Sequence, residues 1–185
     1  MISSARTPLL FLDVDGPLIP FGGTRQQRPD GYPLYGSAAM RATHSNPLLA
    51  RIDPAHGPRL AALPCELVWA TSWMEEANEC VAPWIGLPAL PVVHGHPHSS
   101  ARQTDTCGDR HGKAPAIVEY AAGRAFIWVD DEITEGDRTW VAAHHRGRAL
   151  LHRVEAHRGL VAADYAVLRA WLRTTTGDTT PTDPV

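Results

Sequence analysis

Two carboxylates separated by one residue, Asp13 and Asp15, are the strongest chemical signal in the sequence. They follow a compact apolar run, and at this spacing both side chains can point to the same side of a strand end. One carboxylate could attack phosphorus while the other handles the proton of the leaving group. The pair therefore predicts acid and nucleophile chemistry at the end of a strand.

Four further residues would complete such a site. Asp130 and Asp131, together with Asp13, supply hard oxygen ligands of the kind that Mg²⁺ prefers. Thr71 could donate a hydrogen bond to a phosphoryl oxygen, and Lys113 could neutralise the phosphoryl charge. Lys113 is the only lysine among 17 basic residues, which favours a task that needs an ammonium group rather than a guanidinium.

Each of these residues also has a purely structural interpretation. An Asp after a strand often forms a turn, a Thr before a helix usually caps it, and a lone Lys is usually a solvated charge. An acidic pair can simply interact with a helix dipole. Taken one at a time, the positions favour these structural roles, but chance would not often place all of them at one edge of one sheet.

The elements that would position these residues alternate along the chain. Short apolar runs predict five strands, at Leu9–Val14, Leu67–Ala70, Leu90–Val93, Phe126–Val129 and Ala149–Val154. Helical patterns lie near 58–63, from Ser72 to Trp84, from Lys113 to Gly123, over 137–145 and over 163–173. Ser72 and Glu75 fit a capping box at the start of the second helix. The alternation predicts an α/β fold, with a Rossmann-like parallel sheet of about five strands flanked by helices, whose ligands bind beyond the carboxyl ends of the strands.

Residues 1–173 are expected to form one domain, and the polar tail 174–185 is expected to be disordered. The alternation fails between residues 17 and 64, where Gly, Pro and Arg are frequent. We interpret 17–64 as a flap or minimal cap, with weak extended patches at 32–35 and 48–52 and no large cap domain.

The composition, with 44% hydrophobic and 20% charged residues, is that of an ordinary globular protein. The net charge of -3 gives no general electrostatic footprint for nucleic acid. Three cysteines without paired spacing argue against a disulfide framework. With no signal peptide and no apolar stretch long enough to span a membrane, we expect a cytoplasmic protein without a membrane partner. The sequence leaves the oligomeric state open.

Four ordered segments, FLDVDG, WATSW, GKAP and FIWVDDE, resemble the four motifs of the haloacid dehalogenase (HAD-like) hydrolases. The resemblance covers roughly Leu9 to Leu172. The W-x-T-x-W form of the second motif is most similar to that of small HAD-like proteins, some of which are associated with RNA repair.

The resemblance implies a Mg²⁺-dependent phosphatase and a role for each residue. Asp13 would form an aspartyl-phosphate intermediate and bind the metal. Asp15 would protonate the leaving group and then activate water, and its backbone carbonyl would bind the metal. Asp130 would bind Mg²⁺ directly, and Asp131 directly or through water. The phosphoryl group would be held by the substrate-binding residues Thr71, Ser72 and Lys113.

The resemblance has one departure, Pro17, where Thr or Val is commoner after the glycine. This affects the flap and removes no catalytic group. Asp15 favours phosphoryl transfer over dehalogenation, because dehalogenases of this fold lack that second acid.

Three functions remain open. The leading one is a Mg²⁺-dependent phosphatase that works through an aspartyl phosphate, on a phosphorylated small molecule or a phosphorylated nucleic-acid end. The second is a nucleic-acid end phosphatase in RNA or DNA repair, and the third is a non-catalytic binding or regulatory domain. Two features could contribute to specificity, although the patterns favour an exposed loop for the first and solvated side chains for the second. The first is the histidine loop, which consists of His94, His96 and His98 with nearby Cys107 and His111, and which could bind a metal ion instead of substrate. The second is a set of three arginines in the flap, Arg25, Arg28 and Arg41.

Overall fold

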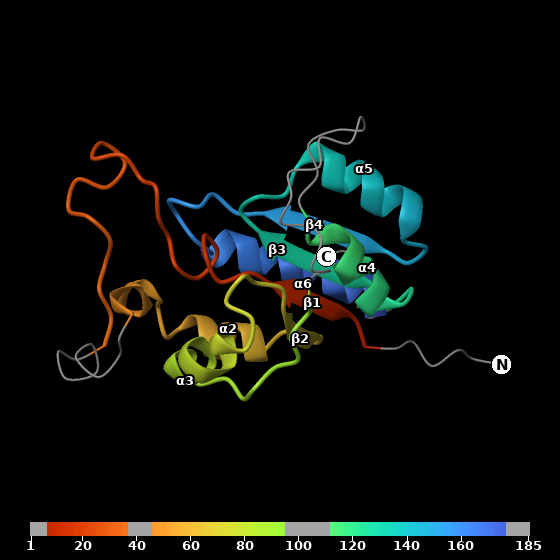
Figure 1. Ribbon diagram of the computed structural model, residues 1–185, viewed down its shortest axis with the longest axis horizontal. Coiled ribbons are helices and arrows are strands. Elements are labelled where there is room, and N and C mark those ends of the chain that lie inside the picture. Colours follow the sequence, from red (N-terminus) through yellow and green to blue (C-terminus); the bar gives the residue numbers. More distant parts are fainter. Residues whose placement is uncertain (1–6, 37–45, 95–111, 177–185) are drawn as a thin grey trace, which may run out of the picture.

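The computed structural model describes residues 7–36, 46–94 and 112–176. Its elements alternate between strands and helices over most of the chain, as Figure 1 shows. In chain order they are β1 (Leu9–Leu12), η1 (Pro47–Arg51), α2 (His56–Ala61), β2 (Glu66–Trp69), η2 (Ala77–Val81), α3 (Ala82–Ile85), α4 (Ala114–Ala121), β3 (Phe126–Asp130), α5 (Glu135–His144), β4 (Ala149–Arg153) and α6 (Ala162–Thr176).

Four parallel strands form the sheet, in the order β2-β1-β3-β4. The last residue of β1, Leu12, pairs with Trp69 of β2 and with Val129 of β3. The carboxyl ends of the three strands are therefore level, and the polar residues that follow them emerge at the same edge of the sheet. The predicted Rossmann-like α/β fold is confirmed.

The predicted strand at Leu90–Val93 is wrong. Within the described residues this segment makes an isolated parallel bridge between Val92 and Trp69, flanked by hydrogen bonds from Trp69 N to Pro91 O and from Val93 N to Trp69 O. Proline cannot donate to a strand ladder, and the two prolines at 88 and 91 limit this segment to a single bridge.

Each face of the sheet is covered by helices, because apolar residues of β1 alternate between two cores. Leu10 and Leu12 pack into the core that is shared with α2, α3 and α6. Leu9 and Phe11 pack into the core that is shared with α4 and α5. Figure 1 shows α5 on one side of the strands and α2 and α3 on the other.

The 17–64 insertion contains η1 and α2, and its described part is otherwise without helices or strands. Residues 32–35 are not extended into a strand, and the extended patch expected at 48–52 is wrong, because Pro47–Arg51 forms a 3₁₀ helix whose N-cap Asn46 accepts from Leu48 N. The guanidinium groups of Arg28 and Arg51 lie over the ring of Tyr32, at 5.2 and 4.7 Å from its centroid. Arg28 also donates to the carbonyl of His157, which ties the insertion to the loop between β4 and α6.

The helix expected from Ser72 starts later than the capping box predicts. Residues 72–75 form turns, Met74 has a left-handed φ of 50°, and regular helical structure begins with the π-helical turn η2, Ala77–Val81. The backbone N–H of Trp73 bonds to the hydroxyl of Thr71 rather than to a cap at Ser72. The left-handed residue prevents a continuous helix here, because α-helical φ values are negative.

The remaining helices lie close to their predicted ranges. Helix α4 begins after Lys113, and α5 begins two residues before the expected start, with a capping box between Thr134 and Asp137. Helix α6 continues to Thr176, so the first three residues of the tail that was expected to be disordered are helical. The rest of the tail lies outside the described residues. In the described parts of the chain, no helix has the length and apolar character that a membrane crossing would require.

Candidate active site

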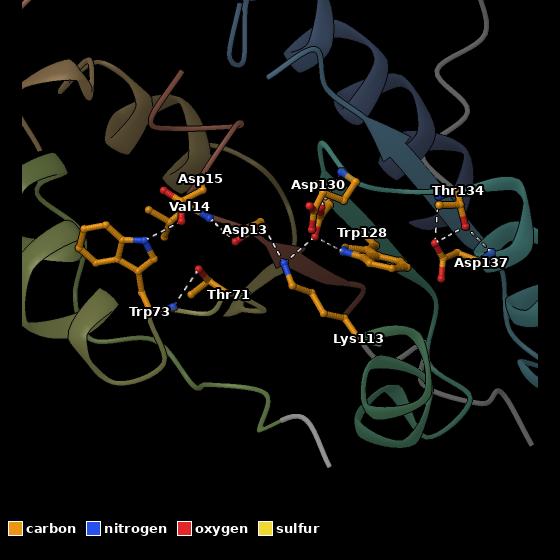
Figure 2. Close-up of polar contacts among 11 residues, drawn as sticks. Asp13, Val14, Asp15, Thr71, Trp73, Lys113, Trp128, Asp130, Thr134 and Asp137 are labelled. Atoms are coloured by element: carbon orange, nitrogen blue, oxygen red, sulfur yellow. Dashed lines mark hydrogen bonds and ion pairs between the residues drawn. The ribbon is translucent and has the colours of Figure 1, made fainter. Parts of the chain in front are cut away.

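Side chains from three strand ends and one helix start meet at the carboxyl edge of the sheet (Figure 2). Asp13 follows β1, Thr71 lies two residues beyond β2, and Asp130 ends β3. Lys113 is the residue that precedes α4. Since β1 lies between β2 and β3, Asp13 occupies the centre of the group.

Asp13, the candidate nucleophile, is buried, with 5% of its surface exposed. Its Oδ1 accepts a hydrogen bond from Val14 N at 2.7 Å, and its Oδ2 accepts from Lys113 Nζ at 2.5 Å. Burial raises the pKa of Asp13 to about 6, and the nearby Asp130 carboxylate adds to the rise, against the opposing effect of Lys113 and of the Thr71 hydroxyl. Both carboxylate oxygens are therefore held in place, in a setting that disfavours an uncompensated negative charge.

Lys113 connects the two most buried carboxylates of the site. Its ammonium group lies 2.5 Å from Asp13 Oδ2 and 2.8 Å from Asp130 Oδ2. Burial alone would lower the pKa of Lys113, but the two carboxylates outweigh it and hold that pKa above its usual value. Lys113 is therefore a permanent cation at the centre of the site.

Asp130 is fully buried and bonded through both oxygens. Its Oδ2 accepts from the indole N–H of Trp128 at 3.2 Å as well as from Lys113, and its Oδ1 accepts from Glu132 N at 2.9 Å. Trp128 lies two residues before Asp130 on β3, so the strand's alternation places both side chains on the same face.

Asp131 packs against the backbone of Gly16. A Cβ atom on Gly16 would lie 2.4 Å from Asp131 Cγ, and Gly16 also has a left-handed φ of 78°. Burial, together with the neighbouring Asp130 charge, raises the pKa of Asp131 to about 6. Both close approach and backbone conformation therefore require glycine at position 16.

Asp13, Asp130 and Asp131 form a group that could hold a metal ion. One carboxylate oxygen from each lies within 4.8 Å of the others. The donor set consists of hard oxygens, and burial, together with the neighbouring Asp130 charge, raises the pKa of Asp13 and Asp131, so that a nearby cation would favour their ionised forms. A divalent cation fits this site in both charge and ligand type.

Asp15 points away from that group and toward Trp73. Its Oδ2 accepts a hydrogen bond from the indole N–H of Trp73 at 3.0 Å. Thr71 is 4% exposed, and its hydroxyl both interacts with Asp13 and accepts from Trp73 N at 3.3 Å. Asp15, the candidate for proton transfer, thus lies on the β2 side of the edge, and Asp130 and Asp131 lie on the β3 side.

Several residues that were expected to bind substrate or contribute to specificity are exposed or make other contacts in the described part of the structure. Ser72 is exposed, and His94 lies 3.5 Å from exposed Glu75. Arg28 is bonded to the His157 carbonyl, whereas Arg25 is exposed. The remaining candidates, His96, His98, Cys107, His111 and Arg41, lie outside the described residues. A cavity of about 290 Å³ lies against the 17–64 insertion, between η1 and Trp84, and is lined by none of the predicted catalytic side chains.

Two tryptophans contribute to the site in ways that the sequence interpretation missed. Trp73 packs against the core and also donates to Asp15, and Trp128 donates to Asp130. The Trp128 contact could have been found from its i, i+2 spacing to Asp130 in a strand. The Trp73 contact has no such signal, because it depends on a left-handed turn at Met74.

Residues 9–165 match the family model described as the HAD domain in Swiss Army Knife RNA repair proteins. The comparisons with curated proteins and with solved structures gave no match. The family match spans more than half of the chain and includes all four motifs that carry the resemblance. The chain therefore belongs to the family of HAD domains found in Swiss Army Knife RNA repair proteins.

Proposed function

We propose that this protein is a Mg²⁺-dependent phosphoric monoester hydrolase that works through an aspartyl phosphate on Asp13. The observation that carries the proposal is the convergence on Asp13 of one ammonium group and two further buried or half-buried carboxylates. This is the charge arrangement that phosphoryl transfer needs, in which positioning and electrostatic compensation provide most of the rate.

Asp13, Asp130 and Asp131 would hold Mg²⁺ through their carboxylates, together with the Asp15 backbone carbonyl that the family motif implies. The bound ion would supply charge neutralisation for the phosphoryl oxygens. The protein's own Lys113 and Thr71 would bind the same oxygens through an ammonium and a hydroxyl group. The raised pKa of Asp13 means that a cation beside it also favours the ionised form that a nucleophile requires.

The two chemical steps follow from the side chains. The Asp13 carboxylate attacks phosphorus, the bond to the leaving oxygen breaks, and protonated Asp15 gives its proton to that oxygen. In the second step, ionised Asp15 takes a proton from water as the water oxygen attacks phosphorus. The bond between phosphorus and Asp13 breaks, which releases inorganic phosphate and restores both aspartates.

The test compares Asp13→Asn with the wild type on an aryl phosphate in the presence of Mg²⁺. Asparagine keeps the shape of the side chain but cannot form the acyl phosphate, so turnover should fall to background. Asp30→Asn, at an exposed position of the insertion, is the matched control and should retain wild-type turnover. Equal activity in Asp13→Asn and the wild type would end the assignment of the nucleophile.

A second candidate narrows the substrate to the phosphorylated end of a nucleic acid. The family match favours it, because the family is that of HAD domains in RNA repair proteins. The net charge of -3 counts against this candidate, because it provides no general attraction for the phosphate backbone. Terminally phosphorylated oligonucleotides should then have a higher kcat/KM than the corresponding mononucleotides, and the absence of any such preference would discredit this narrower function.

The free thiols of Cys65 and Cys80 support the proposal that the protein works in the reducing environment of the cytoplasm.

A further inference from the structure

We propose that Trp73 is a positioning residue, which holds the Asp15 carboxylate so that its free oxygen delivers the proton to the leaving group. This inference rests on the proposed function and assigns a role to a residue that the four motifs leave without one. Its basis is the hydrogen bond from Trp73 Nε1 to Asp15 Oδ2, at 3.0 Å between two partly buried groups. Figure 2 shows the indole turned toward Asp15, on the side of the site opposite Lys113.

The bond uses one oxygen of Asp15 and leaves the other for catalysis. Among the described residues, the Trp73 indole is the donor that holds Asp15 Oδ2, and Oδ1 has no such partner. A short carboxylate side chain that is partly exposed can rotate between staggered positions. Fixing Oδ2 therefore selects one rotamer and points Oδ1 in a defined direction, which is the requirement for an efficient general acid.

The local backbone is arranged to make this contact. Residues 72–75 form turns, and the left-handed φ of 50° at Met74 keeps Trp73 outside the helical segment that follows. Thr71 then anchors Trp73 a second time, because its hydroxyl accepts from Trp73 N at 3.3 Å. A non-glycine residue in the left-handed region costs free energy and tends to persist where surrounding interactions require it.

A positioning role through the general acid predicts a dependence on the leaving group. An aryl oxide such as 4-nitrophenolate leaves as a stable anion and needs little help from a proton donor. An alkoxide, such as the hydroxyl oxygen of a ribose, is a much stronger base and cannot leave without a proton. Loss of the Trp73 N–H should therefore slow the alkyl phosphate far more than the aryl phosphate.

The experiment measures kcat and KM of Trp73→Phe on 4-nitrophenyl phosphate and on a simple alkyl phosphate. General acid catalysis contributes about 10²- to 10⁴-fold, and misorientation should forfeit a part of this. We expect kcat/KM, which reports the step that expels the leaving group, to fall about tenfold or more for the alkyl phosphate and less than about threefold for the aryl phosphate. The ratio of the two kcat/KM values is independent of the folded fraction, because both are measured on one preparation.

The matched control is Trp84→Phe, which removes an indole N–H that donates to Ile52 O at 3.0 Å, away from the site. This variant should leave the ratio of the two kcat/KM values unchanged. Equal losses of kcat/KM on both substrates in Trp73→Phe, or no loss on either, would overturn the positioning role. Either result is distinct from failure of the proposed function, which would appear as undiminished turnover in Asp13→Asn.

Discussion

The contact between Gly16 and Asp131 allows the geometry of the Asp13, Asp130 and Asp131 carboxylates to be perturbed without replacing any of these three residues. In Gly16→Ala, the new methyl group would lie 2.4 Å from both Cγ and Oδ1 of Asp131 and 2.7 Å from its Cβ. Overlap at Cβ cannot be relieved by rotating the end of the side chain. The Asp131 carboxylate or the loop that carries it must therefore move away from Asp13 and Asp130.

The loss in free energy of unfolding expected for Gly16→Ala has two parts. Alanine at a left-handed φ costs about 1–2 kcal/mol wherever it occurs. Gly123 has a φ of 81°, close to the 78° of Gly16, but a Cβ atom added there would meet no atom of the described residues within 4 Å. Gly123→Ala should therefore show the backbone cost alone, and Gly16→Ala should lose about 1–3 kcal/mol more through overpacking.

The decisive measurement is the stabilisation by Mg²⁺ in urea unfolding, which needs no substrate. A ligand present at 100 times its Kd stabilises the folded state by about 2.7 kcal/mol. Disturbing a metal site from its surroundings typically weakens binding about 10- to 100-fold. At the same Mg²⁺ concentration, Gly16→Ala should thus lose roughly half or more of that stabilisation, whereas Gly123→Ala should keep it. If Mg²⁺ stabilises both variants equally, Asp131 does not hold the ion and the reasoning from the close approach is wrong.

Three other predictions concern stability. Asp13 keeps its proton up to a pH of about 6 in the folded protein but only to about 3.8 in the unfolded chain, so its ionisation opposes folding as the pH rises through this window. Without divalent cations, Asp13→Asn should therefore raise the free energy of unfolding at pH 7.5 by up to about 3 kcal/mol, and the gain should vanish near pH 4. Lys113→Met should lower that free energy by about 3–5 kcal/mol at pH 7.5, because it leaves buried carboxylates without their cation, and by less at pH 5. Tyr165→Phe removes the hydroxyl that lies 2.8 Å from His56 Nδ1 and should cost about 1–3 kcal/mol in urea unfolding, whereas Tyr120→Phe, at a 41% exposed position, should cost less than about 0.5 kcal/mol.

Those parts of the fold that depend on local pattern could be predicted from the sequence. The apolar run before Asp13 and the run before Asp130 became adjacent strands, because continuous apolar segments of this length are buried on both faces of a parallel sheet. The level ends of these strands then follow from parallel pairing. This is why residues more than a hundred positions apart could be expected at one edge of the sheet.

The parts that were missed depend on contacts distant in sequence or on backbone detail. The capping box at Ser72 is a local signal that predicts a helix start. The structure has a turn at Met74 instead, which allows Trp73 to reach Asp15. The bond between His56 and Tyr165 joins residues 109 positions apart. No periodicity in either segment indicates such a pairing.

The central position of β1 gives the site two unlike halves. On the β2 side, Asp13 meets neutral groups that offer protons, the hydroxyl of Thr71 and the indole of Trp73 behind Asp15. On the β3 side it meets full charges, which are those of Lys113 and Asp130. Side chains beyond β2 can therefore change without disturbing the charged groups on the β3 side. Changes on the β3 side are more constrained, because removal of Lys113 or Asp130 leaves a buried charge without its partner.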